Sequence, residues 1–234
     1  MSSQRRVILK LSGEALAGSN HFGFDEDTVR AVALQAQPAV EDGVELAVVI
    51  GGGNFWRGRS GTEIERVKSD QIGMLATVMN AIYVSEVFRS EGLETEIYTP
   101  FVCGSMSRLF VKDDAVADLK AGKVVFFAGG TGHPFFSTDT GIVLRALEMG
   151  ADEILLAKNI DGVYDSDPEK NPDAKRFDSI SIDEVVERKL GVIDLTASAL
   201  CAANRVPLAV FSLQEEQSIY KALRGDIKGT RITV

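Results

Sequence analysis

The chain has 234 residues, and 45% of them are hydrophobic, which is enough for one large α/β domain with a substantial core. Acidic residues outnumber basic ones by 34 to 25, the formal net charge is −9, and no run of five or six like charges occurs. Such a chain is a poor partner for DNA, RNA or an anionic membrane, so any anionic ligand must be held by local groups.

The N-terminal segment is basic, but the apolar stretch after it is broken at Lys10 and is too short for a signal sequence. With no long apolar span elsewhere, we expect a single domain over residues 1–234, located in the cytoplasm. The cysteines and histidines show no metal-ligand spacing, so no metal site built from side chains is expected. These residues are Cys103, Cys201, His21 and His133.

Short apolar runs alternate along the chain with segments of helical period. The predicted strands lie near residues 7–11, 46–50, 95–98, 124–128, 154–157 and 207–211. The predicted helices cover residues 25–42, 70–89, 113–121, 138–149, 182–190, 194–204 and 215–223. This alternation predicts an α/β fold, a three-layer αβα sandwich with a largely parallel central sheet.

The clearest helix, near residues 70–89, has one apolar stripe, which we expect to pack on the sheet or on another subunit. The stripe consists of Ile72, Leu75, Met79, Ile82, Tyr83 and Val87. By contrast, residues 159–175 lack an apolar period and contain three pairs of turn-forming residues. A loop of that length is expected to have a function.

Two strands each run into a glycine-bearing turn, Ser12-Gly13 and Gly51-Gly52-Gly53. Glycine lets the backbone approach an anion closely, and free backbone N–H groups at one end of a sheet bind phosphate. Such turns are often only turns, but Lys10 beside one and Arg57 beside the other favour two phosphate groups side by side. The G-x-G-x-x-G pattern fails at Trp56 and no P-loop pattern occurs, so neither a Rossmann dehydrogenase nor a P-loop enzyme is favoured.

Lys10 places an ammonium group at the end of a strand that is otherwise predicted to be buried. An unpaired charge there is costly, so Lys10 needs an anionic partner, either a carboxylate or phosphate oxygens. The adjacent Ser12-Gly13 turn favours phosphate. Asp139 is expected both to cap the helix near residue 138 and to orient Lys10.

The segment from residue 128 to residue 140 follows another apolar strand and is predicted to form a pocket wall. Phe135 and Phe136 offer flat faces for a planar ring, and Thr131 and Thr138 offer hydroxyl groups. The alternative is a core-packed loop in which Thr138 or Asp139 caps the next helix.

Two other polar residues have simple alternatives to a functional role. His133 has no partner for a catalytic triad, so a polar loop residue is the favoured interpretation. Asp70 is explained equally well as a negative charge near the start of its helix.

Together these motifs resemble those of the bacterial uridine monophosphate kinases, which belong to the amino-acid kinase superfamily. The matching blocks keep the same order from about Val7 to Gly229-Thr230. They are Lys10–Leu16, Gly51–Asn54 with Arg57-Gly58, Asp70 with Gly73–Thr77 and Asn80, Gly130–Gly132, Pro134–Thr140, and Asp161–Tyr164 with Asp167-Pro168.

The resemblance implies transfer of the γ-phosphoryl group of ATP to UMP, giving UDP and ADP, in pyrimidine nucleotide biosynthesis, with Mg²⁺ accompanying ATP. It assigns ATP binding to Lys10, Leu11, Ser12, Gly13, Gly53, Arg57, Lys158, Tyr164 and Asp167. It assigns UMP binding to Gly52, Asp70, Thr131, Gly132, His133, Pro134, Phe135, Phe136, Ser137 and Thr138. Lys10, Asp139 and Arg57 carry the catalytic roles.

This assignment agrees with the absence of a Ser/His/Asp motif. An acceptor phosphate has its second ionisation at about pH 6, so at neutral pH it already has nucleophilic oxygens and needs no general base. The protein must bring two polyanions into line and offset their repulsion, which lysine, arginine and backbone N–H groups can do.

Two departures from the family pattern are His133, where the family usually has Asn, and residues 103–110, which match less well than their flanks. We expect His133 to make UMP affinity depend on pH. Relatives of this kind are typically homohexamers that GTP activates and UTP inhibits; the resemblance implies the assembly and leaves both responses open.

Three alternatives remain. A superfamily kinase for a carboxylate or carbamate would share the glycine turns and Lys10, although the Phe135-Phe136 loop with Arg57 and Asp70 favours a nucleotide acceptor. The same fold also serves a molybdenum storage protein, against which Lys10, Arg57, Asp70 and Asp139 argue. A nucleotide sensor without turnover would bind UTP or GTP tightly and transfer nothing.

Overall fold

A nine-stranded sheet runs through the described part of this computed structural model, which comprises residues 4–56 and 64–234. The strand order is β4-β3-β5-β2-β1-β6-β8-β9-β7, and neighbours are parallel except for the antiparallel pair β8 and β9. The strands are β1 (Arg6–Leu11), β2 (Glu45–Ile50), β3 (Thr95–Thr99), β4 (Arg108–Leu109), β5 (Val124–Phe127), β6 (Glu153–Lys158), β7 (Ser179–Ser181), β8 (Leu208–Ser212) and β9 (Gly229–Thr233).

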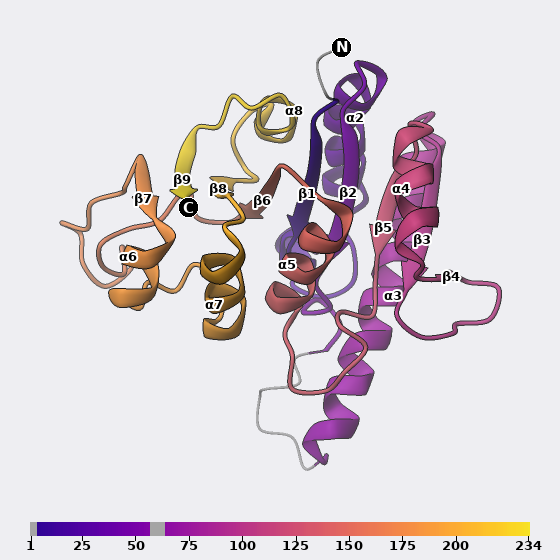
Figure 1. The fold of residues 1–234 in the computed structure, drawn as a ribbon, viewed down its shortest axis with the longest axis horizontal. Helices are drawn as coiled ribbons and strands as arrows, with labels where there is room; N and C mark the ends of the chain where they lie inside the picture. Colours follow the sequence, from indigo (N-terminus) through magenta and orange to yellow (C-terminus); the bar gives the residue numbers. More distant parts are fainter. Residues whose placement is uncertain (1–3, 57–63) are drawn as a thin grey trace.

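Helices cover both faces of this sheet (Figure 1). They are α1 (Gly13–Leu16), α2 (Glu26–Glu41), α3 (Arg66–Ser90), α4 (Lys112–Lys120), α5 (Thr138–Met149), α6 (Ile182–Glu187), α7 (Leu195–Asn204) and α8 (Ser218–Leu223), with a 3-10 turn, η1 (Gly18–Asn20). Helices α2, α3 and α8 contribute to one buried apolar cluster, and α4, α5, α6 and α7 contribute to the other. The predicted three-layer αβα sandwich is confirmed.

The strand pattern explains why the central runs are apolar without alternation. Leu9 and Leu11 of β1 belong to the cluster on the α2 side, whereas Ile8 belongs to the cluster on the α5 side. A strand covered on both faces buries every side chain. Because side chains alternate, Lys10 follows Ile8 toward the face that α5 covers.

All six predicted strands are present, each end within one residue of its expected position. The hydrophobic pattern misses β4, β7 and β9, of which β4 and β7 are edge strands of two and three residues. Helix α6 ends at Glu187 rather than near residue 190, and α8 begins at Ser218 rather than near residue 215. Lys189 and Gln217 have positive φ angles of 53° and 60°, which a continuous helix excludes at these positions. Residues 159–175 form turns, as predicted, with one bridge from Tyr164 to Arg176.

Helix α3 differs from its prediction in its start and in the face that it buries. It begins at Arg66, so Asp70 lies in its second turn, which corrects the interpretation of Asp70 as a charge at the helix start. Ile72, Leu75, Met79 and Ile82 are 38 to 55% exposed, so most of the stripe does not pack on the sheet, and its packing on another subunit stays a prediction. The buried face consists of Ser69, Ala76, Thr77, Val78, Asn80, Ala81, Val84, Ser85 and Phe88.

Small and polar side chains bring α3 close to the loops beneath it, and that arrangement turns the larger apolar residues outward. Phe88 is fully buried and meets Phe126 of β5 edge to face at 5.3 Å. Among the described helices, α3 alone is long and apolar enough to cross a membrane by length and composition. Its packing through Phe88 is that of a core helix in this fold.

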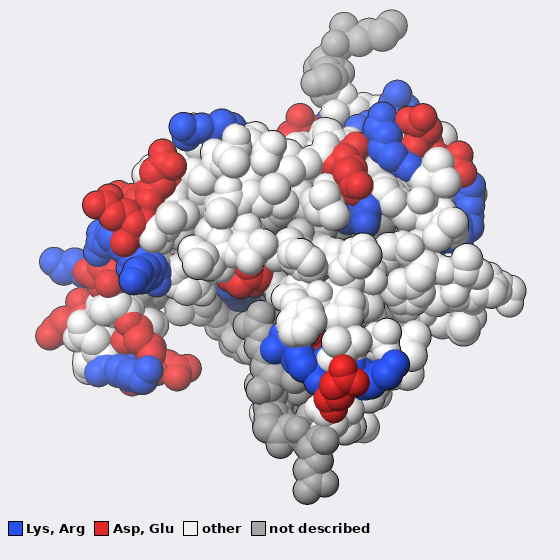
Figure 2. Space-filling view, turned by 60° about the horizontal axis from the view of Figure 1, so that its bottom comes forward, with Lys and Arg blue, Asp and Glu red and all other residues white. Residues whose placement is uncertain are grey.

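Figure 2 shows the molecule turned about the horizontal axis from the view of Figure 1, so that the bottom of that view comes forward. Lys and Arg side chains lie there in small groups mixed with Asp and Glu, separated by uncharged surface. To bind the phosphate backbone of a nucleic acid, a protein surface needs a continuous basic area. This face therefore offers no such area among the residues that the structure describes.

Candidate active site

The candidate site lies where the strand order reverses direction. On one side of β1 lie β2 and β5, and on the other lie β6 and β8. The carboxyl ends of these parallel strands meet at one edge, and in open α/β sheets ligands bind in the crevice outside such a switch point. The loops after β1, β2 and β5 and the end of β6 carry most of the predicted site residues.

The two glycine turns touch each other at this edge. A Cβ atom on Gly13 would lie 2.5 Å from the Gly51 carbonyl oxygen and 2.5 Å from Asn54 Oδ1. The N–H of Gly51 donates to the carbonyl oxygen of Leu11 at 3.1 Å. Glycine at position 13 is therefore required by space, and the predicted juxtaposition of the two turns is present.

Buried polar side chains of α3 hold the loops after β2 and β5. Asn80 Nδ2 donates to the Gly51 carbonyl oxygen at 2.7 Å, and the amides of Asn80 and Asn54 exchange hydrogen bonds at 2.7 and 3.1 Å. Thr77 Oγ1 accepts a hydrogen bond from the Gly129 N–H at 2.7 Å. One helix thus fixes two of the loops that form the site.

Lys10 at the end of β1 forms an ion pair with Asp139 in the first turn of α5. Their side chains are 17 and 19% exposed, so the pair is largely shielded from solvent. The predicted contact is present, and its catalytic role stays a prediction.

The cap of α5 is Ser137, not Asp139 or Thr138. The backbone of Ser137 is extended, and its Oγ accepts hydrogen bonds from the N–H groups of Asp139 at 3.0 Å and Thr140 at 3.3 Å. The expectation that Asp139 or Thr138 caps the helix is wrong, because Ser137 supplies the oxygen one residue earlier. Asp139 is left free to face Lys10.

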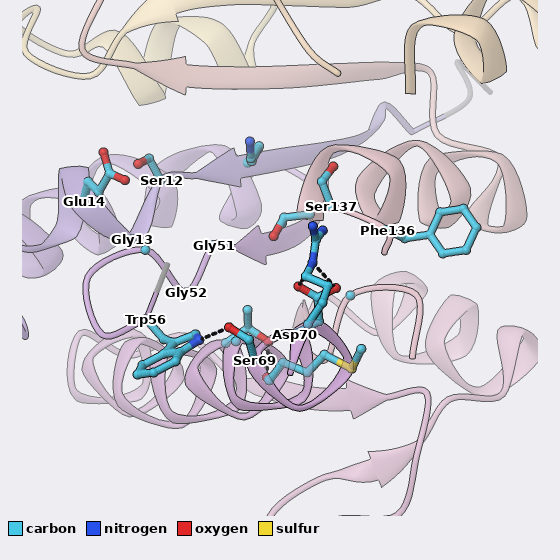
Figure 3. A pocket seen from close by; sticks show the side chains of 18 residues that line it. Ser12, Gly13, Glu14, Gly51, Gly52, Trp56, Ser69, Asp70, Phe136 and Ser137 are labelled. Atoms are coloured by element: carbon cyan, nitrogen blue, oxygen red, sulfur yellow. Dashed lines mark hydrogen bonds and ion pairs between the residues drawn. The ribbon is translucent and has the colours of Figure 1, made fainter. Parts of the chain in front are cut away.

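A cavity of about 440 Å³ opens beside the two glycine turns. Figure 3 shows Ser12 and Gly13 on one side of it, with Ser69 and Asp70 of α3 on the other. The predicted residues in its lining are Lys10, Ser12, Gly13, Gly52, Gly53, Asp70, Phe136, Ser137 and Thr138. The cavity therefore combines members of both the ATP and the UMP sets.

Asp70 ties the loop after β5 to α3. Arg66 Nε lies 2.9 Å from both carboxylate oxygens of Asp70, and the N–H of Phe135 donates to Asp70 Oδ2 at 2.8 Å. Phe135 has a φ of 71°, which is strained for a residue other than glycine, and the Arg66 guanidinium lies 5.4 Å from the centre of its ring. The Asp70 contact compensates for that strain.

The structure does not bring all predicted UMP residues to this cavity. Phe135 and Phe136 are 64 and 51% exposed, and the Phe136 ring points away from the other labelled side chains (Figure 3). The two rings therefore do not form the flat-sided wall that was expected. Thr131, Gly132, His133, Pro134 and Phe135 are absent from the lining.

Leu11, another member of the predicted ATP set, is also absent from the lining. Leu11 is a fully buried residue of β1, and its carbonyl oxygen accepts the hydrogen bond from the Gly51 N–H. Arg57 lies outside the described residues.

A second cavity, also of about 440 Å³, is lined by the predicted ATP residues Lys158, Tyr164 and Asp167. Its opposite wall is the segment 189–192 between α6 and α7. Tyr164 Oη donates to Asp161 Oδ1 at 2.8 Å, and Arg176 pairs with Asp161 at 2.7 Å. Burial works against the ionised Asp161, but these two hydrogen bonds hold its pKa below the usual value, so Asp161 anchors the loop as a carboxylate.

Lys158 lies between the two cavities. Its Nζ donates to the carbonyl oxygen of Val192. Burial lowers the pKa of Lys158; the negative charge of Asp139 opposes this effect and the positive charge of Lys10 adds to it. The three charged groups are therefore close enough to interact, and an anion between the lysines would stabilise both ammonium groups.

The model of the amino acid kinase family matches residues 5–212. The chain belongs to the amino acid kinase family. A solved UMP kinase from Bacillus anthracis is 35% identical, with a TM-score of 0.93 over 98% of this chain and 96% of that one. A UMP kinase from Ureaplasma parvum is 30% identical, with a TM-score of 0.93 over 99% of both chains. A uridylate kinase from Archaeoglobus fulgidus is 25% identical, with a TM-score of 0.71 over 97% of this chain and 99% of that one.

In this amino acid kinase, sequence reasoning missed three groups that shape the site. Arg66 holds Asp70, Asn54 and Asn80 form a buried amide pair, and Asp194 contacts Ser137. The polar positions 77 and 80 on an otherwise apolar helix were a usable signal, because a buried polar side chain needs a partner. The predicted helix over residues 194–204 begins at Asp194, but no local pattern indicates its contact with Ser137 or the contact of Arg66 with Asp70.

Replacing Thr77 by valine removes the acceptor of the buried Gly129 N–H. We expect the free energy of unfolding to fall by about 1–3 kcal/mol, because a buried donor loses its partner while the side-chain shape is kept. Thr95→Val is the matched control, since Thr95 Oγ1 is the one buried side-chain polar atom without a partner in the described part of the chain. Urea unfolding of both variants checks this, and equal losses would contradict it.

Proposed function

We propose that this chain is an ATP-dependent UMP kinase that produces UDP and ADP. The observation that carries the proposal is the pair of touching glycine turns with Lys10 and Asp139 beside them, at the first of two cavities of nucleotide-binding size. Membership of the amino acid kinase family and the likeness to solved UMP kinases support the choice of phosphoryl donor and acceptor.

In the proposed reaction, an oxygen of the UMP phosphate forms a bond to the γ-phosphorus of ATP. The bond from that phosphorus to the β,γ-bridging oxygen breaks, and its electron pair stays with ADP. Lys10 Nζ and the N–H groups of the two turns stabilise the charge on the transferring group, and Asp139 orients Lys10. No proton has to be removed from the acceptor, because its attacking oxygen is already ionised.

The two cavities divide the substrates. We assign the adenosine side of ATP to the second cavity, beside Tyr164 and Asp167, with Lys158 facing the phosphates. We assign UMP to the first cavity, which Asp70, Gly52 and Thr138 line, with Asp70 as the proposed ribose contact and Gly52 and Thr138 as proposed contacts of the UMP phosphate side. Arg57 of the predicted ATP set and residues Thr131 to Phe136 of the predicted UMP set complete the proposed sites.

Mg²⁺ fits this site as a companion of the nucleotide. In the described residues, no three His, Cys, Asp or Glu side chains come together to hold a metal. Mg²⁺ in kinases is held largely by substrate phosphates, waters and one or two carboxylates, so such a cluster is not required. When bound with ATP, the ion would neutralise phosphate charge.

We further propose a cytoplasmic protein that works as a single domain in pyrimidine nucleotide biosynthesis and assembles as a homohexamer, with GTP as activator and UTP as inhibitor. The exposed apolar residues of α3 support assembly through that face. A second apolar surface lies on the segment between β3 and α4, which projects from the body of the molecule (Figure 1). Its exposed apolar residues are Val102, Met106, Leu109 and Val111.

The direct test is a coupled ADP-release assay with ATP and Mg²⁺ against UMP, CMP, dUMP, AMP, carbamate and acetylglutamate. We expect turnover with UMP, and a loss of at least about a hundredfold in kcat for Lys10→Ala, because an electrostatic contact to the transferring group is removed. Leu34→Ala, a half-exposed residue of α2, is the control variant. Turnover only with carbamate or acetylglutamate, or nucleotide binding without turnover, would contradict the proposal.

His133→Asn tests whether His133 senses pH. His133 is exposed, and its backbone N–H donates to Thr131 Oγ1 at 3.3 Å, so replacing the side chain leaves this hydrogen bond and the core intact. We expect the pH dependence of the KM for UMP between about pH 5.5 and 8 to flatten in the variant. The same profile in both proteins would show that another group titrates.

Assembly through α3 can be tested with Leu75→Lys. Leu75 is 55% exposed on the stripe of α3, and a charge there would be buried in an interface. We expect the sedimentation coefficient to fall relative to the parent chain, whereas Leu34→Lys on α2 leaves it unchanged. A parent chain that sediments as a monomer would refute the assembly.

A further inference from the structure

Asp194 joins the beginnings of two helices that face the site. It is the N-cap of α7, where Oδ1 accepts a hydrogen bond from the Ala197 N–H at 3.0 Å. Its Oδ2 accepts a hydrogen bond from the hydroxyl group of Ser137, the N-cap of α5, and Thr140 Oγ1 lies 3.4 Å away. One carboxylate thus contacts the first turns of both α5 and α7.

The Ser137 hydroxyl group is fully used by these contacts. It donates its proton to Asp194, and its two lone pairs accept the N–H groups of Asp139 and Thr140. A serine hydroxyl has one donor and two acceptor positions, so none is left for a ligand. Ser137 can therefore reach UMP only through its backbone, and its side chain serves to place the first turn of α5.

The segment before Asp194 reaches the other cavity. Residues 189–192 line the adenosine-side cavity, and the Val192 carbonyl oxygen accepts a hydrogen bond from Lys158. Two residues later, Asp194 holds Ser137, which is next to the first cavity. Asp194 therefore links residues 189–192, which line the second cavity, to the first turn of α5, which carries Asp139 beside the first cavity.

We propose that Asp194 is a positioning residue for phosphoryl transfer: through Ser137 it holds the first turn of α5, and hence Asp139 and Lys10, in register with the donor-side segment 189–192. The inference rests on the proposed kinase function and adds a residue to it. Asp194 and Ser137 are 57 residues apart in the chain, so their contact is purely tertiary.

Asp194→Asn tests the proposal with little change in shape. Asparagine caps a helix as well as aspartate does, so α7 keeps its cap. An amide has one accepting oxygen and one donating NH₂ group, whereas the carboxylate accepts at both oxygens. When the amide oxygen caps α7, its NH₂ group faces the Ser137 hydroxyl, which must turn and give up one of the α5 amides.

Asp25→Asn is the matched control. Asp25 is the N-cap of α2, and it accepts hydrogen bonds from the Thr28 N–H at 2.9 Å and from the Thr28 side chain. A threonine hydroxyl can also accept a hydrogen bond from an amide NH₂ group, so the amide replaces the carboxylate without conflict. Ser181→Ala, which removes the cap of α6, is the corresponding control for Ser137→Ala.

We expect Asp194→Asn to lower kcat for UMP by about tenfold to a hundredfold through misplacement of Lys10, while both KM values change by less than about threefold. Ser137→Ala should have a similar effect, and the double variant should lose no more than the single ones, because both break one link. Losses in kcat that multiply, or a loss equal to that of Asp25→Asn, would overturn the proposal.

Amide hydrogen exchange gives a second readout that needs no activity. The Asp139 and Thr140 amides should exchange faster in Asp194→Asn than in the parent chain, with the core strands unchanged. If the parent chain fails to phosphorylate UMP, this measurement still decides whether Asp194 holds α5. Unchanged protection of both amides in Asp194→Asn would overturn the proposal by itself.

Discussion

The site depends on one positive charge, Lys10, at the carboxyl end of a strand that is otherwise buried. An ammonium group in that place must be neutralised, and Asp139 does so from the first turn of α5. The pair fixes how α5 approaches the sheet edge, and it sets the lysine between two turns whose N–H groups also favour anions. A phosphoryl group in transfer carries the charge that all of these groups can stabilise.

Helix α3 shows how such a site is kept rigid. Its buried side is polar where it meets the loops, through Thr77 and Asn80, and apolar where it meets the sheet, through Phe88. Each buried polar group there has a loop group as its partner, so the loops gain a defined position and the helix gains satisfied hydrogen bonds. The outward apolar residues of α3 are then available to pack on another protein surface. Such a contact would be made by the same helix that holds both loops.

Much of the architecture follows from the sequence, because buried strands leave unambiguous apolar runs and turns mark their ends. The motifs also predicted that Lys10 and the two glycine turns meet at one edge of the sheet, which they do, and their contact with phosphate stays a prediction. Local patterns could not decide between the sheet and another subunit as the partner of the α3 stripe, and they could not choose the cap of α5 among adjacent Ser137, Thr138 and Asp139. Contacts such as that of Asp194 with Ser137 depend on packing between distant segments and leave no periodic signal.

In the proposed reaction, the charged groups beside the two cavities act electrostatically rather than as an acid or a base. Lys10 reaches the edge from β1 and Lys158 from the neighbouring strand β6, with Asp139 interacting with both. Lys10, Lys158 and Asp139 together carry one net positive charge, and in the proposed reaction the transferring phosphoryl group brings negative charge to them. In that reaction, residues that hold elements in register, such as Asp70 beside Phe135, contribute by aligning the reacting groups.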